Sequence, residues 1–133
     1  MRNVTAFDTQ GRYILLQIYV EGKNGRKRDC IALLDTGAPS TEFSDEVLQH
    51  LGFLEDTNPN VQLKPGLQTQ KYGQIVLPHI EACSCAMKSL AVYVSHFEKS
   101  WGIDALIGLD FFRQFRVTID YKAGQIITES YGD

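Results

Sequence analysis

The stretch Leu33-Leu34-Asp35-Thr36-Gly37-Ala38 decides the fold, because it sets a carboxylate directly after an apolar run. Residues 28–34 are predicted to form a strand that ends in this run. An ionised carboxylate at the end of a buried strand is costly unless polar partners surround it. The same letters also suit an ordinary turn, since Asp forms turns and Gly tolerates positive φ. Asp-Thr-Gly by itself is therefore consistent with an ordinary polar loop. Only the rest of the chain can distinguish such a loop from a functional carboxylate.

A second apolar stretch, Ala105-Leu106-Ile107-Gly108-Leu109-Asp110-Phe111-Phe112, repeats the layout of the first. Each stretch predicts a buried strand that ends shortly before a short helix. After the first stretch, Ser44 is a good N-cap for a helix over residues 44–51. In the second, Asp110 is expected to cap a helix over residues 111–115. The sequence thus predicts two strand–loop–helix units, of which the first contains Asp-Thr-Gly.

Most of the remaining sequence also predicts strands, which are expected over residues 13–20, 75–80, 90–94, 116–121 and 125–128. A polar segment from Val61 to Gln74, with Pro65-Gly66 near its middle, predicts a long hairpin that stands away from the core. The length of 133 residues, with 44% hydrophobic and 22% charged residues, suits one compact domain over residues 1–133.

In their order and separation, the two motifs resemble those of the retropepsin-like aspartic proteases, and the resemblance covers roughly residues 12–128. Residues 115–121 also look like the bacterial members of that group. The resemblance implies an all-β fold, a closed acid-protease barrel with one or two short helices and a flap hairpin. It implies an aspartic endopeptidase that acts as a homodimer, without a metal or another cofactor. The chain has no second Asp-Thr-Gly or Asp-Ser-Gly, so two catalytic aspartates require Asp35 from each of two chains.

The resemblance also implies roles for single residues. Asp35 is the expected catalytic carboxylate, Thr36 is expected to hydrogen-bond across the two-fold axis, and the backbone of Gly37 is expected to donate to the carboxylates. Ala38 lacks the hydroxyl that a serine would offer, so the carboxylate pair is expected to keep its proton to a higher pH than in Ala38→Ser. Gly108 is expected where any side chain would collide with the Asp35 loop.

A polypeptide substrate is expected to bind as an extended strand between the flap and the floor of a cleft. The residues expected to contact it are Leu33, Ala38, Lys64, Pro65, Gly66, Leu67, Ile107, Gly108 and Leu109. The resemblance also implies a preference for hydrophobic residues beside the cut. The hairpin over residues 61–74 is the predicted flap, and its tip departs from the glycine-rich retroviral flap by having a proline and a single glycine.

Two other interpretations stay open at this point. A chain with this fold can be a binding or dimerisation module that does not turn over substrate. It can also be a piece of a longer polyprotein or of a membrane-tethered protease. The intact Asp-Thr-Gly favours an enzyme, because a catalytically silent domain has no physical need for paired carboxylates.

Composition argues against several other classes of function. The formal net charge is −3, which gives no broad basic field for nucleic acid or an anionic membrane. The basic cluster at residues 23–28 is predicted to be a solvated hairpin loop, with a nucleic-acid contact as the alternative. No stretch approaches the roughly 20 apolar residues of a membrane-spanning helix, and residues 1–8 lack the apolar core of a signal peptide. We therefore expect a cytoplasmic protein.

The cysteines and the chain ends carry weaker signals. Three cysteines fit a reducing compartment better than a disulfide scaffold, and the spacing of Cys83-Ser84-Cys85 is wrong for a zinc knuckle. No metal site is expected. Residues 1–7 are a candidate for a strand shared between the two chains of a dimer, although their apolar pattern is poor.

Overall fold

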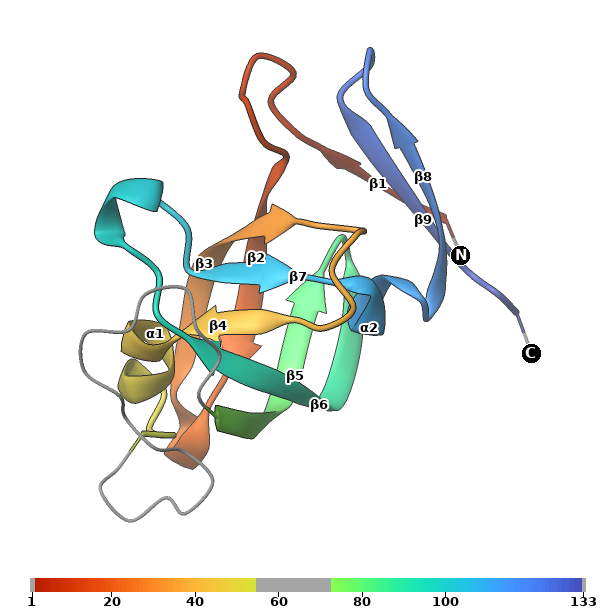
Figure 1. The fold of residues 1–133 in the computed structure, drawn as a ribbon. Coiled ribbons are helices and arrows are strands. Elements are labelled where there is room, and N and C mark those ends of the chain that lie inside the picture. The colour runs from red at the N-terminus through yellow and green to blue at the C-terminus, as the bar shows by residue number, and fades with distance from the viewer. Residues whose placement is uncertain (1, 55–72, 133) are drawn as a thin grey trace.

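The computed structural model describes residues 2–54 and 73–132 and shows an all-β fold with two short helices (Figure 1). Six strands close into a barrel, in the order β2 (Leu15–Glu21), β3 (Lys27–Leu34), β7 (Ala105–Ile107), β4 (Glu42–Ser44), β6 (Cys85–Ser95) and β5 (Gly73–Ala82). The helices are α1 (Asp45–His50) and α2 (Leu109–Phe112), and single 3-10 turns occur at η1 (Lys23–Gly25) and η2 (Lys99–Trp101). This architecture confirms the predicted closed barrel.

Strand alternation builds the core of the barrel. In β2, Leu16, Ile18 and Val20 are buried, while the alternate residues Leu15 and Gln17 are exposed. The same two-residue period runs through β3, β5 and β6, because successive side chains of a strand face opposite sides. The largest fully buried side chains include those of Phe43, Phe111, Ile18, Leu48, Leu51, Leu77, Ile80 and Ile107.

The register of β3 and β7 brings the two sequence motifs together. These strands are parallel neighbours, and Leu33 lies opposite Leu106 while Leu34 lies opposite Ile107. Parallel strands need a long crossover, which the segment between the two motifs supplies. Since both strands end at the same edge of the barrel, Asp35 and Gly108 follow them side by side.

The two helices follow the predicted layout with one correction. Ser44 caps α1 as expected, and its Oγ accepts from the backbone N–H of Glu46 at 3.2 Å. The prediction that Asp110 caps a helix over residues 111–115 is wrong, because α2 begins earlier and its N-cap is Gly108. The side chain of Asp110 is turned instead toward Thr41.

A three-stranded sheet of β1 (Arg2–Ala6), β9 (Gln125–Ser130) and β8 (Phe115–Asp120) lies beside the barrel, with both chain ends on it (Figure 1). Despite its poor apolar pattern, β1 pairs with β9 of the same chain over five residue pairs. The sheet contacts the turn between β5 and β6 through buried Thr128, whose hydroxyl donates to the carbonyl of Cys83 at 3.1 Å.

The predicted flap lies outside the described residues, apart from Gly73 and Gln74, which begin β5. Lys64, Pro65, Gly66 and Leu67 are among the residues not described. In the described part of the chain, neither helix has the length and apolar character needed to cross a membrane.

Candidate active site

Asp35 immediately follows β3, and the backbone around it fixes its position. Its N–H donates to the carbonyl of Ile107 at 3.0 Å, which continues the pairing of β3 with β7. Its Oδ1 accepts from the N–H of Gly37 at 3.0 Å, as the resemblance implied. The side chain of Asp35 is half-buried, whereas Thr36 and Gly37 are exposed. The carboxylate therefore sits on a surface turn that a buried strand pair supports.

Gly108 lies where the turn leaves no room for a side chain. A Cβ at this position would stand 2.7 Å from the carbonyl oxygen of Ala38 and 2.9 Å from that of Ser40. The backbone of Gly108 is extended, with φ −107°, so the requirement for glycine is one of space and not of conformation. The next residue, Leu109, donates its N–H to the carbonyl of Ala38 at 2.8 Å. The expected close approach of Gly108 to the Asp35 loop is confirmed.

A second pair of residues holds the far end of the loop, and sequence reasoning missed it. The N–H of Thr41 donates to Oδ2 of Asp110 at 2.8 Å, and the Thr41 hydroxyl donates to Oδ1 at 2.6 Å. The same hydroxyl accepts from the N–H of Gly108 at 3.1 Å. The two residues are 69 positions apart, and only the position of Asp110 two residues after Gly108 hints at a role near the site.

The overall fold occurs in proteins of known structure. The chain is similar to a retropepsin-like aspartic protease from Rickettsia conorii, with 19% identity, a TM-score of 0.65, and coverage of 96% of this chain and 89% of that one. It is also similar to the retroviral protease-like domain of Ddi1 from Leishmania major, with 17% identity, a TM-score of 0.58, and coverage of 92% and 97%. The chain has the retropepsin-like fold. No protein-family model matches the sequence. No curated protein matches it either.

The outward face of the retropepsin-like barrel offers an apolar surface next to Asp35. Leu33 is half-buried and lies opposite Leu106 on β7 and Leu15 on β2, both of which also have exposed surface. Ile107 of β7 and Leu109 of α2 were both expected to contact the substrate. Leu109 is half-buried beside the loop. Ile107 is fully buried inside the barrel, so Leu106 and not Ile107 presents surface on this face of β7.

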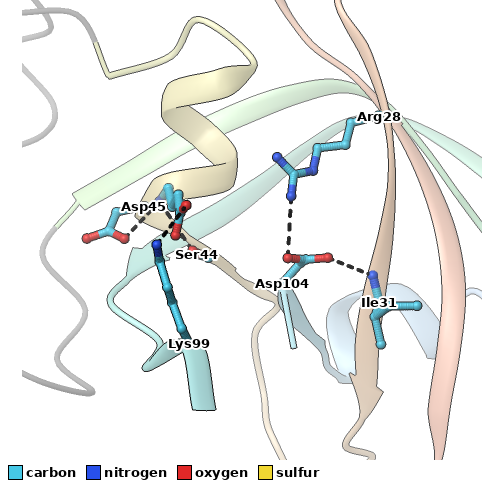
Figure 2. A network of polar contacts seen from close by, with 7 residues as sticks. Arg28, Ile31, Ser44, Asp45, Lys99 and Asp104 are labelled. Carbon is cyan, nitrogen blue, oxygen red and sulfur yellow. Dashed lines mark hydrogen bonds and ion pairs between the residues drawn. The ribbon is translucent and has the colours of Figure 1, made fainter. Parts of the chain in front are cut away.

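A polar network fixes the start of β7 to β3 (Figure 2). The carboxylate of Asp104 accepts from the N–H of Ile31 at 2.9 Å and pairs with Arg28 at 3.6 Å, and the N–H of Asp104 donates to the carbonyl of Ile31 at 2.8 Å. A groove of about 400 Å³ beside this network is lined by Arg28, Ser44, Glu46, Val47, Phe97, Glu98, Lys99, Gly102, Ile103 and Asp104. Asp35 follows the opposite end of β3, so the network aligns the strands without joining the site.

Two of the three cysteines are buried thiols that ionise less readily than a free cysteine. Burial raises the pKa of the Cys30 thiol to about 12 and that of the Cys83 thiol to about 11. All three cysteines, including the half-buried Cys85, are free thiols. Within residues 2–54 and 73–132, no three His, Cys, Asp or Glu side chains gather closely enough to hold a metal ion.

Proposed function

We propose that the protein is an aspartic endopeptidase, in which two Asp35 carboxylates of a homodimer activate a water molecule. The observation that supports this most is the Asp35-Thr36-Gly37 turn at the end of β3, with the Gly37 N–H on the carboxylate. This turn occurs in a fold whose solved neighbours are a retropepsin-like aspartic protease and a retroviral protease-like domain. One such turn per chain supplies one carboxylate, so the second has to come from another copy.

Two carboxylates at close range explain the chemistry. Like charges so near one another cannot both ionise easily, so the pair shares one proton over a wide pH range. The charged carboxylate takes a proton from water as a general base, and the protonated one polarises the peptide carbonyl, as in aspartic proteases in general. The exposed Thr36 is the residue we expect to hydrogen-bond to the partner loop across the two-fold axis.

The expected substrate is a polypeptide in an extended conformation. Leu33 and Leu106 present apolar surface two residues before Asp35 and Gly108, which favours hydrophobic side chains beside the scissile bond. Ala38 and Leu109 are half-buried beside the same loop and complete the expected contacts in the described residues. The three free thiols suit a reducing compartment such as the cytoplasm.

The deciding experiment is cleavage of a diverse peptide mixture by the purified chain, from acidic to neutral pH, with and without pepstatin and beside Asp35→Asn. We expect cleavage by the natural chain alone, enriched at bonds flanked by hydrophobic residues. The dimer is followed by sedimentation in the same buffers. A folded dimer that cleaves no peptide at any of these pH values would contradict the proposal and favour a binding or dimerisation module.

A further inference from the structure

Thr41 is a fully buried polar residue at the end of the Asp35 loop, and each of its polar atoms has a partner. Its N–H and its hydroxyl donate to the two carboxylate oxygens of Asp110, and its hydroxyl accepts from Gly108. Its carbonyl accepts from the N–H of Tyr93 at 3.0 Å. The Thr41 hydroxyl is thus the side-chain group that links the end of the loop to both Asp110 and Gly108.

Asp110 fits this contact through its charge and its shape. Its carboxylate accepts three hydrogen bonds, two from Thr41 and one from the N–H of Phe111 at 2.9 Å. Hydrogen bonds to an ionised acceptor are shorter and roughly twice as strong as neutral ones. An asparagine offers a single acceptor oxygen, so its amide group would face one of the Thr41 donors. The pair with Thr41 therefore requires a carboxylate.

The pair completes the attachment of the loop. Residues 35–41 join β3 to β4 and are tied to the β7–α2 segment at three points. Asp35 bonds to Ile107 at the first end and Ala38 bonds to Leu109 in the middle. Thr41 bonds to Asp110 at the last end. Removal of the last tie leaves the loop attached to the β7–α2 segment only through Asp35 and Ala38.

We propose that Thr41 and Asp110 are positioning residues that hold the Asp35 loop in the geometry needed for catalysis, an inference that rests on the proposed endopeptidase function. Thr41 is fully buried at the end of the loop, and its hydroxyl joins Asp110 to the N–H of Gly108. A shift of about 1 Å in a reacting group can cost roughly 100-fold in rate. Because Thr41 is fully buried and the Asp110 carboxylate is bonded to it, their loss should lower kcat with little change in KM.

The test compares two buried threonines changed in the same way. Thr41→Val removes the hydroxyl that bonds to Asp110 and Gly108, and Thr41→Ser retains it. Thr128→Val is the matched control, because Thr128 is also fully buried and hydrogen-bonded but lies in the terminal sheet. We expect Thr41→Val to lower kcat about 10- to 100-fold with KM within about threefold. Thr41→Ser and Thr128→Val, assayed as folded protein at a saturating substrate concentration, should have kcat values within about threefold of that of the natural chain.

A double variant adds a check on the pair itself. Asp110→Asn should lower kcat in the same way as Thr41→Val, and the two changes together should cost little more than the worse of them, because both break one contact. Equal kcat values for Thr41→Val and Thr41→Ser would overturn the inference. So would a loss of activity in Thr41→Val that merely follows the unfolded fraction, as measured by thermal unfolding.

Amide hydrogen exchange separates this inference from the proposed function. The N–H groups of Ala38 and Leu109 both take part in bonds of the loop, at 3.2 Å to Asp35 and at 2.8 Å to Ala38. They should exchange faster in Thr41→Val than in Thr41→Ser or Thr128→Val. If the natural chain cleaves nothing, the endopeptidase proposal fails while this comparison still decides whether the pair orders the loop. If the natural chain is an active enzyme, unchanged exchange in Thr41→Val would still show that the pair does not order the loop.

Discussion

The unit from β3 to α1 and the unit from β7 to α2 share one layout but do different work. In each, a strand of the barrel leads to a short helix, directly in the second unit and through a loop and β4 in the first, and β3 and β7 are parallel neighbours. The first unit turns its carboxylate, Asp35, to the surface. The second turns its carboxylate, Asp110, back onto the first, and its glycine, Gly108, makes room for the loop. A carboxylate on a surface turn keeps one position only where its neighbours support the turn, and here the second unit supplies that support.

The sharpest contrast between the units is the same substitution at both carboxylates. Asp35→Asn should abolish peptide cleavage, because the pair then lacks its general base, and should leave the free energy of unfolding within about 0.5 kcal/mol. Asp110→Asn should leave measurable cleavage but lower the free energy of unfolding by about 1–3 kcal/mol, since a Thr41 donor loses its acceptor. Peptide assays and urea unfolding measure the two effects. Equal stability losses would remove the distinction between a reactive and a supporting carboxylate.

Substitution of the glycines of the two units by alanine should change the free energy of unfolding by different amounts. A Cβ at Gly108 would lie 2.7 Å from backbone, whereas one at Gly37 would approach the Asp35 carboxylate no closer than 3.3 Å. Gly108→Ala should therefore lower the free energy of unfolding by about 1–3 kcal/mol through overpacking, and Gly37→Ala by less than about 1 kcal/mol. Chemical denaturation of both variants gives the comparison. Gly11→Ala, at an exposed site, is the control for the substitution itself.

Adjacent residues of β7 test which face of this strand meets the substrate. Ile107 is fully buried, so Ile107→Ala should cost about 2–5 kcal/mol of stability by leaving a cavity. Leu106 lies on the outward face opposite Leu33, so Leu106→Ala should cost less stability and should raise KM for peptides with hydrophobic residues beside the cut. A larger KM change in folded Ile107→Ala than in Leu106→Ala would reverse the assignment of the two faces.

The smallest expected effect concerns Ala38. A serine hydroxyl at this position could donate to the carboxylate pair and stabilise its charged form, which lowers the pH at which the pair loses its proton. The acid limb of the pH–rate profile should therefore move to lower pH in Ala38→Ser, by about half a unit for one net hydrogen bond. An acid limb at the same pH in both proteins would show that the hydroxyl does not reach the pair.

Local signals in the sequence predicted the parts of the site that depend on neighbouring residues. The apolar run before Asp35 predicted the strand, and Ser44 predicted the start of α1, because strand propensity and helix capping act over a few residues. The resemblance of the two motifs placed Gly108 against the Asp35 loop, which the structure confirms. The apolar pattern of residues 2–6 indicated a strand only weakly, because this strand depends on its pairing with β9 more than on its own sequence.

By itself, the sequence determined which residue types meet at the site, an Asp-Thr-Gly turn after one apolar strand and a glycine after another. The tertiary structure alone decided which groups face each other. The parallel register of β3 and β7 points Leu106 outward and Ile107 inward. It also brings Asp110 to Thr41 across 69 positions of chain. Periodicity and capping are local, whereas the face of a short strand and the partner of a buried carboxylate depend on how distant segments align.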